Sequence, residues 1–458
     1  MKGTFRRLKI GVSGVRGVVG ESLSPVLVAD FAAAFGEFAG GGRVLVGRDT
    51  RSSGEMYENA VAAGLLSVGI QPVLTGILPT PSLQVAVRET SASGAIAITA
   101  SHNGNEWNAL KFIGADGLFL NQIANDELLD IYNQPDSNYV PENRIRTEKL
   151  MYDAFRIHQE KILRSVDADA IRKKHFRVAV DCCNGVGALY SRKFLEAFGC
   201  EVISIFDTCG NGFERPPEPV PANLGALSEC VKKHHCAVGF AQDPDGDRIS
   251  LVSGSGAIPG VQNSATLIAG HLIRNNRSGT VVLNIQTTTA IEQIAGECGV
   301  EVLYCPVGEV NVTDAMNASG AFLGIEGSSG GIIYPKISMC RDSYAAMAVV
   351  LEMLAQRGMT IDSMLETLPC LSSVSVKVLC PSAQAGVNAL REIRSRYLDR
   401  NPIVVDGVRI DMGGGAWVLL RRSNTEPVIR ILAESSEEST AERLARDFEK
   451  ELQGLLKK

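Results

Sequence analysis

Three stretches of the chain share one order of apolar and polar positions. Each begins with a continuous apolar run rich in β-branched residues, passes through a polar or small loop, and continues with apolar residues at helical spacing. The stretches are RVLVGRDTRSSGEMYENAVAAGLLSVGIQPVLTG from Arg43, FRVAVDCCNGVGALYSRKFLEAFGCEVISIF from Phe176, and GTVVLNIQTTTAIEQIAGECGVEVLYCPVG from Gly279. A glycine stands where each helix should end, at Gly69, Gly199 and Gly299. The pattern predicts three α/β modules, although such units also occur in unrelated α/β proteins.

The C-terminal part of the chain has a different pattern. Short strands are predicted at VSVKVL, at NPIVVDGVRIDM with a possible turn at Asp406 and Gly407, at AWVLLRR and at VIRILAE. Helical patterns lie near residues 383–397 and 440–456. The predicted fold class is therefore α/β, with three related α/β modules followed by a C-terminal α+β domain. The predicted boundaries are 1–150, 151–255, 256–368 and 369–458.

One helix is predicted near the N-terminus. Ser24 followed by Pro25 is typical of a helix start. The serine hydroxyl can accept a hydrogen bond from a free N–H of the first turn, and the N–H that proline lacks would have no partner at the first helical position. The apolar residues that follow can share one face: Leu27, Phe31, Phe35 and Phe38. These aromatic side chains are predicted to lie in the core.

Composition narrows the class of protein. The chain has 458 residues, which exceeds the size of a single hydrophobic core, and 45% of them are apolar, enough for several cores. The formal net charge is -6 and no dense Lys/Arg tract occurs, so no nucleic-acid partner is expected. No apolar stretch is long enough to span a membrane and the N-terminus lacks a signal-peptide core, so a cytoplasmic location without membrane contact is expected.

Cysteine usage argues against a disulfide framework. The 11 cysteines are odd in number, none lies before Cys182, and none forms a C-x-x-C pair. Neither a disulfide scaffold nor a zinc site is indicated, and the thiols are expected to be reduced structural residues.

An acidic loop is the first candidate site. In AVGFAQDPDGDRISLV, the residues Asp243, Asp245 and Asp247 alternate between two apolar runs, so one turn can direct three carboxylates to one point. Their mutual repulsion favours a cation, and hard oxygen ligands favour Mg²⁺. An EF-hand is excluded because its glycine and glutamate positions hold Arg248 and Gly254. The structural alternative is a solvated acidic turn.

The loop in RRSNTEPVIR is a candidate phosphate site. Arg421 offers a planar fork for phosphate oxygens, and the loop supplies neutral donors from Ser423, Asn424 and Thr425. Clusters of Ser, Asn and Thr more often form turns, so this pattern alone leaves both interpretations open.

A third loop carries candidate catalytic residues. In ITASHNGNEWNALKF, Ser101 can accept and donate a phosphoryl group, and Lys111 can act as a base or stabilise charge. His102 can orient groups or handle a proton, while Asn103 and Gly104 shape the loop. A serine after an apolar run more often caps a turn, and a lone histidine is more often structural, so the other loops must support the catalytic interpretation.

Taken together, these loops resemble one known family. The matching segments, in order, are GVSGVRG (11–17), GRDTRSSG (47–54), PTP (79–81), TASHN (99–103), DPDGDR (243–248), GIEGSSGG (324–331) and RRSNTEP (421–427). Over nearly its whole length the chain resembles the α-D-phosphohexomutases. The resemblance implies three related α/β modules and a C-terminal domain around a central cleft, with one loop from each domain.

The resemblance also implies roles for residues. Ser101 would be the phosphoserine, and Mg²⁺ would be held by its phosphate with Asp243, Asp245 and Asp247. Arg16 and Lys111 would handle proton and charge, and Arg248 would stand beside the metal. The residues expected to bind substrate are Glu326 and Ser328 at the sugar hydroxyls, and Arg421, Ser423, Asn424, Thr425 and Arg430 at the phosphate.

The implied reaction moves a phosphoryl group between the 6- and 1-positions of a hexose phosphate through a hexose 1,6-bisphosphate, which also serves as activator. The expected partner of the protein is the small-molecule hexose phosphate, and the protein is expected to be a monomer or homodimer. Two departures from common members are Gly104 in place of proline, and Ser329 and Gly330 where many members have Gly and His. The segments EGSSGG and EWNALKF resemble archaeal-type phosphoglucosamine mutases. Glucosamine 6-phosphate is therefore the expected substrate, with phosphoglucomutase or phosphomannomutase activity as the alternative.

Two other functions compete with this interpretation. In a haloacid dehalogenase-like phosphatase Asp243 would be the nucleophile and Asp245 the acid, but Asp247 replaces the usual threonine and the SHN and SNTEP loops have no role. A non-catalytic sugar-phosphate sensor would explain the altered sugar loop but not the retained Ser101 and Lys111.

Overall fold

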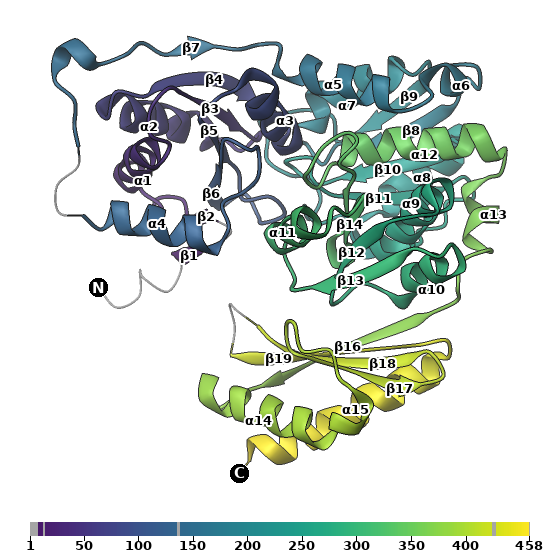
Figure 1. The fold of residues 1–458 in the computed structure, drawn as a ribbon. Helices are drawn as coiled ribbons and strands as arrows, with labels where there is room; N and C mark the ends of the chain where they lie inside the picture. Colours follow the sequence, from purple (N-terminus) through teal and green to yellow (C-terminus); the bar gives the residue numbers. More distant parts are fainter. Residues whose placement is uncertain (1–7, 12–13, 135–137, 424–426, 458) are drawn as a thin grey trace. The chain divides into compact units, whose positions relative to one another are not determined.

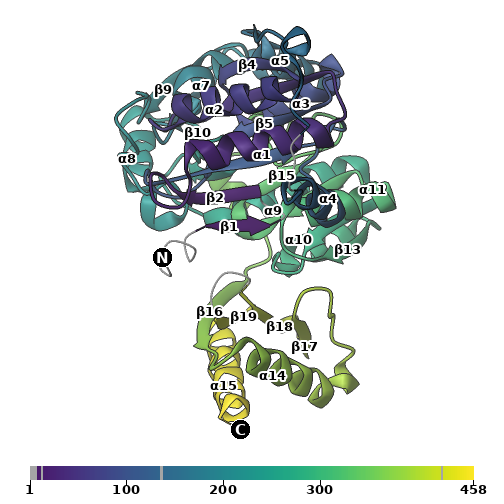
Figure 2. The ribbon, with the colours of Figure 1, turned by 90° about the vertical axis from the view of Figure 1, so that its left-hand side faces the viewer.

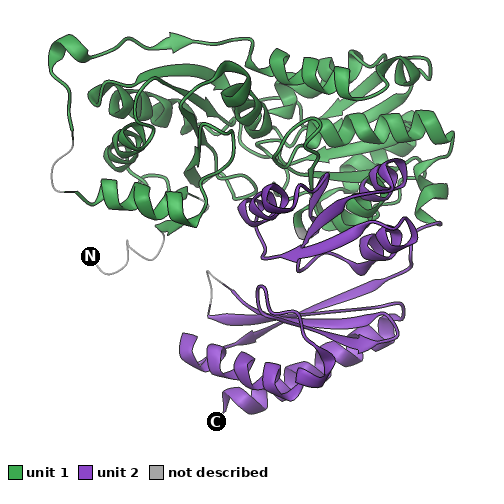
Figure 3. Ribbon diagram, in the orientation of Figure 1, with its two compact units in different colours: residues 1–268, 329–366 green, residues 269–328, 367–458 purple. Residues whose placement is uncertain are grey.

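The structure is a computed structural model that describes residues 8–11, 14–134, 138–423 and 427–457. The chain forms two compact units (Figure 3). The first unit contains residues 1–268 and 329–366, and the second unit contains residues 269–328 and 367–458. The four predicted domain boundaries stay a prediction, because this division follows two bodies and not four.

A single topology occurs three times (Figure 1). In each module the first strand pairs in parallel with the second on one side and with the third on the other. The first module is β3 (Arg43–Arg48), α2 (Gly54–Ser67), β4 (Gln71–Ile77), α3 (Thr80–Thr90) and β5 (Gly94–Ile98). The second is β8 (Arg177–Asp181), α7 (Gly187–Glu196), β9 (Glu201–Ile205), α8 (Gly225–His234) and β10 (Val238–Gln242). The third is β12 (Thr280–Asn284), α10 (Thr289–Glu297), β13 (Glu301–Cys305), α11 (Glu309–Ser319) and β14 (Leu323–Glu326).

The predicted helix ends are confirmed. Gly69, Gly199 and Gly299 follow α2, α7 and α10 with φ of 77°, 75° and 69°, the left-handed region in which glycine carries no steric penalty. Because the strand order and the helix ends both repeat, the prediction of three related α/β modules is confirmed.

Further elements complete the first unit. The sheet of the first module extends to seven strands in the order β1-β2-β6-β5-β3-β4-β7, and that of the second has the order β11-β10-β8-β9. The added strands are β1 (Lys9–Gly11), β2 (Gly14–Val18), β6 (Trp107–Ile113), β7 (Lys149–Leu150) and β11 (Ile249–Ser253), and β15 (Gly331–Ile333) follows later in the chain. The added helices are α1 (Pro25–Phe38), α4 (Gln122–Tyr132), η2 (Glu142–Arg144), α5 (Ala154–Ser165), α6 (Ala168–Arg172), η3 (Pro221–Asn223), α12 (Ser343–Arg357) and α13 (Ile361–Leu365). Helix α9 (Gly260–Asn276) runs between the second and third modules, and η4 (Gly327–Ser329) directly follows β14.

Helix α1 has the predicted cap and core face. The Ser24 hydroxyl accepts a hydrogen bond from the Leu27 N–H at 3.2 Å. Phe31 and Phe35 are fully buried in the core of the first module, and the half-buried Leu27 and Phe38 pack against it. The helical spacing of these apolar residues thus predicted the buried face.

The C-terminal domain is an antiparallel sheet with two helices on one face (Figure 2). Its strand order is β16-β19-β18-β17, and its core includes side chains from the sheet, α14 and α15. The elements are β16 (Ser372–Leu379), α14 (Ala383–Arg396), η5 (Leu398–Arg400), β17 (Val408–Gly413), β18 (Ala416–Arg422), β19 (Val428–Ser435) and α15 (Glu438–Leu456). The predicted α+β domain is confirmed.

One predicted strand is only partly formed. In NPIVVDGVRIDM the strand begins at Val408, and before it only Ile403 makes an isolated bridge, to Arg409. The Asp406 carboxylate accepts hydrogen bonds from the Val307 N–H at 3.1 Å and from Arg421 Nε at 2.6 Å. These bonds hold residues 405–407 in a bend, at the place where the sequence predicted a turn, and Gly407 has a φ of 95°.

Two expectations from composition can be compared with the structure. No helix in the described ranges is both long and apolar enough to cross a membrane. All eleven cysteines lie in described segments and none is bonded to another.

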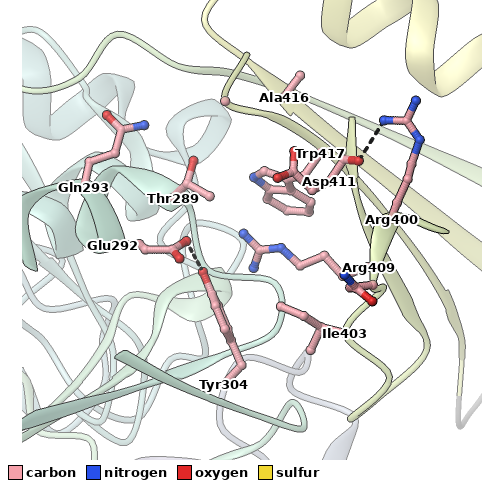
Figure 4. Close-up of a pocket in the computed structure, with 12 residues that line it drawn as sticks. Thr289, Glu292, Gln293, Tyr304, Arg400, Ile403, Arg409, Asp411, Ala416 and Trp417 are labelled. Carbon is pink, nitrogen blue, oxygen red and sulfur yellow. Dashed lines mark hydrogen bonds between the residues drawn. The ribbon is translucent and has the colours of Figure 1, made fainter. Parts of the chain in front are cut away.

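A cavity of about 570 Å³ is lined by residues of the second unit (Figure 4). It lies where the third module meets the C-terminal domain. Arg409 is 4% exposed, and its guanidinium carbon lies 4.5 Å from the Tyr304 ring centre and 3.9 Å from the Trp417 ring centre. Arg409 Nη1 also donates a hydrogen bond to the Ile285 carbonyl at 3.1 Å. Arg409 is therefore one of the buried side chains that join the third module to the C-terminal domain.

Replacing Arg409 with alanine should destabilise the second unit. The change removes two desolvated cation–π contacts and leaves a buried carbonyl without its donor, so the free energy of unfolding should fall by about 2–4 kcal/mol. Urea denaturation of the full chain measures this loss. The exposed Arg400 beside the same cavity is the matched control, and Arg400→Ala should change stability by less than about 1 kcal/mol. Equal effects of the two variants would contradict the structural role given to Arg409.

Candidate active site

Three candidate loops occupy the same place in their modules. Ser101 follows β5, Asp243 follows β10, and Glu326 ends β14, and these are the third strands of the three modules. The carboxyl ends of parallel strands are where α/β folds place their sites. Ser101 and Asp243 belong to the first unit, and Glu326 belongs to the second.

Ser101 lies against the acidic loop. Its Oγ donates a hydrogen bond to Asp243 Oδ2 at 2.8 Å, although 142 positions separate the two residues in the sequence. Ser101 is 3% exposed and Asp243 is fully buried. The serine loop and the acidic loop are therefore two parts of one cluster.

The backbone of the serine loop is strained and braced. Ser101 has φ of 49°, a left-handed conformation that costs a residue with a Cβ about 1 kcal/mol. The Thr99 hydroxyl accepts the Ser101 N–H at 2.9 Å, and Arg51 Nη2 donates to the carbonyls of Ser101 at 2.8 Å and Asn103 at 2.6 Å. Arg16 Nη1 donates to the Asn103 side chain at 2.7 Å. These bonds offset the strain and fix the direction of the Ser101 hydroxyl.

Each aspartate of the acidic loop has at least one carboxylate oxygen that accepts hydrogen bonds from the protein. Asp243 Oδ1 accepts hydrogen bonds from two backbone N–H groups of its own loop, at 3.1 and 3.2 Å. Asp245 Oδ2 accepts from Lys111 Nζ at 2.8 Å and from the Thr80 hydroxyl at 3.1 Å. Asp247 Oδ2 accepts from Arg341 Nη2 at 2.6 Å. The carboxylates are thereby fixed in orientation.

The remaining oxygens fit a divalent cation. Asp245 Oδ1 and Asp247 Oδ1 are buried with no hydrogen-bond partner, and one ligand atom from each of the three aspartates lies within 4.8 Å of the others. Buried carboxylate oxygens left without donors are costly unless a cation satisfies them. Hard oxygen ligands of this kind suit Mg²⁺.

Electrostatics point the same way. Burial raises the pKa of the Asp243 carboxyl well above its usual range, and the neighbouring Asp247 and Asp245 charges raise it further. For Asp245 burial also acts to raise the pKa, but the charge and hydrogen bond of Lys111 outweigh it and the pKa is lowered. The cluster therefore favours keeping a proton near Asp243, and a bound cation would displace that proton.

Three cations surround the three carboxylates. Lys111 contacts Asp245, Arg341 contacts Asp247, and Arg248 Nε lies 3.7 Å from Asp247 Oδ1 and 4.0 Å from Asp243 Oδ2. The three positive side chains nearly cancel the charges of the three carboxylates. The site can therefore hold a divalent cation together with a phosphoryl group, because the two positive charges of the one balance the two negative charges of the other.

His102 lies in the same electropositive surroundings. Burial lowers the pKa of its imidazole to about 3, with further lowering by Arg248, Arg16 and Arg341. The pKa of the Arg16 guanidinium is also lowered, mainly by burial. At neutral pH the His102 imidazole is therefore uncharged, with a buried Nδ1 that has no partner.

The predicted substrate residues belong to the second unit. Glu326 is 6% exposed, and Arg421 pairs with Arg430 across β18 and β19 while its Nε donates to Asp406 at 2.6 Å. The Ser423 N–H donates to the Val428 carbonyl at 2.9 Å. The side chain of Ser328 and the residues Asn424 and Thr425 lie outside the described residues.

Sequence reasoning did not assign roles to three residues of this cluster: Arg51, Thr80 and Arg341. Arg51 and Thr80 lie inside the GRDTRSSG and PTP segments, so those motifs could have drawn attention to them. Arg341 lies in no segment that had been singled out, and only its contact with Asp247 reveals it.

The structure combines repeated α/β modules with a loop serine that is hydrogen-bonded to a buried cluster of carboxylates able to hold a cation. This combination defines a class of protein, the enzymes that transfer phosphoryl groups. Family models for the four phosphoglucomutase/phosphomannomutase domains match the chain at residues 7–139, 156–256, 262–370 and 376–451. The chain belongs to the phosphoglucomutase/phosphomannomutase family. The predicted resemblance to the phosphohexomutases is confirmed, and the predicted class of enzyme, an isomerase, is the class of this family.

Individual proteins give the same picture. The chain is 34% identical to a probable phosphoglucosamine mutase of Methanopyrus kandleri over 96% of both chains. It is 32% identical to a phosphoglucosamine/phosphogalactosamine mutase of Sulfurisphaera tokodaii, over 97% of this chain and 99% of the relative. A solved family structure from Burkholderia thailandensis has a TM-score of 0.85 at 24% identity, over 97% of this chain and 96% of that chain.

Proposed function

We propose that this protein is a phosphoglucosamine mutase that interconverts glucosamine 6-phosphate and glucosamine 1-phosphate through a phosphoserine at Ser101. The observation that carries the proposal is the hydrogen bond from Ser101 Oγ to Asp243 inside the buried carboxylate cluster. The names of the two archaeal relatives support glucosamine phosphate as the substrate. Phosphoglucomutase or phosphomannomutase activity is the alternative within the family.

The reaction has two balanced transfers. In the first, the bond between phosphorus and Ser101 Oγ breaks as the 1-hydroxyl of glucosamine 6-phosphate attacks, giving a 1,6-bisphosphate and a free serine. The 1-hydroxyl loses its proton as it attacks and Ser101 Oγ takes up a proton as it leaves, while Lys111 and Arg16 stabilise the charge that develops on the phosphoryl oxygens. In the second, after the bisphosphate has turned around, Ser101 Oγ loses its proton and attacks the phosphorus at the 6-position. The bond from that phosphorus to the 6-oxygen breaks and the oxygen takes up a proton, which restores the phosphoserine and releases glucosamine 1-phosphate.

The carboxylate cluster would hold Mg²⁺ through Asp243, Asp245 and Asp247, together with the phosphate on Ser101. When bound, the metal supplies Lewis-acid stabilisation of the transferring phosphoryl group. Arg248 stands beside the carboxylates and neutralises the same charge. Because the cluster is buried, water is kept from hydrolysing the phosphoserine.

The second unit would bind the rest of the substrate. Glu326 and Ser328 would accept and donate hydrogen bonds at the sugar hydroxyls. Arg421, Ser423, Asn424, Thr425 and Arg430 would hold the phosphate that does not react. Two arginines facing each other across β18 and β19 support an anion site at this hairpin.

A comparative substrate assay tests the proposal. Glucosamine, glucose and mannose 6-phosphates are each supplied with Mg²⁺ and a catalytic amount of the matching 1,6-bisphosphate, and the 1-phosphate formed is measured. We expect the highest kcat/KM for glucosamine 6-phosphate, by about tenfold or more, which corresponds to about 1.4 kcal/mol of transition-state binding. A preference for glucose or mannose phosphate would favour the alternative. Absence of turnover on all three by a phosphorylated protein would favour a sugar-phosphate sensor.

A further inference from the structure

Residues 341–343, at the start of helix α12, contact the acidic loop. Arg341 Nη2 donates to Asp247 Oδ2 at 2.6 Å, and Arg341 Nη1 donates to the Ser329 hydroxyl at 3.3 Å. The Ser343 hydroxyl donates to the Gly246 carbonyl at 2.6 Å. The segment therefore binds both the side chain and the backbone of the loop, through two residues that are 9% and 0% exposed.

The segment is itself rigidly anchored. Asp342 caps α12, because its Oδ1 accepts the N–H groups of Tyr344 and Ala345, both at 3.0 Å. Its Oδ2 lies 2.8 Å from His158 Nε2 and accepts the Ser338 hydroxyl at 2.7 Å. All of these polar groups are buried. Arg341 thus extends from a fixed helix start.

We propose that Arg341 is a positioning residue that turns the Asp247 carboxylate so that Oδ1 is available to a divalent cation. Arg341 engages Oδ2, while Asp247 Oδ1 is buried without a hydrogen-bond partner, as is Asp245 Oδ1. The planar guanidinium fork bridges Asp247 and Ser329, which restricts rotation of the carboxylate. The proposal rests on the cation site of the proposed function, and not on the identity of the sugar.

The affinity of the full-length protein for Mn²⁺, added without substrate and measured by electron paramagnetic resonance, tests this role. Partners that orient a metal ligand are worth about 10–100-fold in metal affinity, so Arg341→Gln should weaken Mn²⁺ binding by that factor. Arg341→Lys keeps the positive charge but loses the planar fork of the guanidinium. Its Mn²⁺ affinity should lie between that of the wild type and that of Arg341→Gln. Arg164 is the matched control, since its side chain is 79% exposed, and Arg164→Gln should leave the affinity unchanged.

A double-mutant cycle separates positioning from a general loss of structure. If Arg341 acts through Asp247, Arg341→Gln should not weaken Mn²⁺ binding further in an Asp247→Asn background. Two results would overturn the proposal. Equal weakening in both backgrounds would indicate general damage to the structure, and tighter Mn²⁺ binding by Arg341→Gln would indicate that the guanidinium only repels the cation. A protein without mutase turnover that still shows the coupling would refute the proposed function while supporting the role of Arg341.

Discussion

Replacement of Ser101 by alanine should lower mutase kcat by at least about 10⁴-fold, because removing a covalent nucleophile abolishes the step that the rest of the site supports. The fold should survive. The Ser101 hydroxyl makes its hydrogen bond to Asp243, so its loss should cost about 1–2 kcal/mol of stability. Coupled assays measure the rate, and thermal unfolding measures the stability.

Glycine at the same position supplies a second variant. Ser101→Gly also lacks the hydroxyl and should be equally inactive, but it relieves the left-handed backbone strain at φ of 49° and should be more stable than the alanine variant by about 1 kcal/mol. The exposed Ser319 is the control, and Ser319→Ala should keep full activity. A Ser101→Ala enzyme within tenfold of the wild-type rate would show that another group carries the phosphoryl group.

Replacement of Asp245 by asparagine should have the second largest effect. The change removes a carboxylate whose Oδ1 is free for the cation and whose Oδ2 holds Lys111. Because metal stabilisation of the transferring group is worth several kcal/mol, kcat/KM should fall by about 10²–10⁴-fold and the Mg²⁺ concentration needed for half-maximal rate should rise. A Mg²⁺ titration of the initial rate measures both quantities.

An exposed carboxylate provides the control for this variant. The side chain of Asp169 is 81% exposed, so Asp169→Asn should leave the rate and the Mg²⁺ requirement unchanged. If Asp245→Asn instead kept the wild-type Mg²⁺ requirement while losing rate, the carboxylate would act on Lys111 alone, and the three-aspartate cation site would be wrong.

The repeated architecture could be predicted because its signals are local. A β-branched run, a helical apolar face and a left-handed glycine such as Gly69 each reflect the conformation of a few neighbouring residues. The same holds for the capped helix at Ser24 and for the convergence of carboxylates around one turn. Local signals failed in the extent of one strand: the turn at Asp406 and Gly407 was predicted, but before it only Ile403 makes an isolated bridge.

The loops of the candidate site could be predicted from the sequence, but the hydrogen bonds that hold these loops in place could not. The pattern of the acidic loop indicates a cation without any knowledge of the fold, whereas the contact between Ser101 and Asp243 depends on the packing of two modules. Arg51 and Arg341 act through bonds to backbone carbonyls and to one carboxylate oxygen. Arg51 lies in the GRDTRSSG segment, but the segment does not show which groups it binds, and Arg341 lies in no segment with a recognisable pattern.

Mapping the phosphorylated residue is the most direct measurement of the central claim. The protein is incubated with glucose or glucosamine 1,6-bisphosphate, quenched, digested and sequenced by mass spectrometry under conditions that preserve both phosphoserine and acyl phosphate. The account predicts one phosphoryl group, on Ser101, that disappears when excess hexose 6-phosphate is added. A phosphoryl group on Asp243 with Ser101 unmodified would contradict it and would favour an aspartate-based phosphatase.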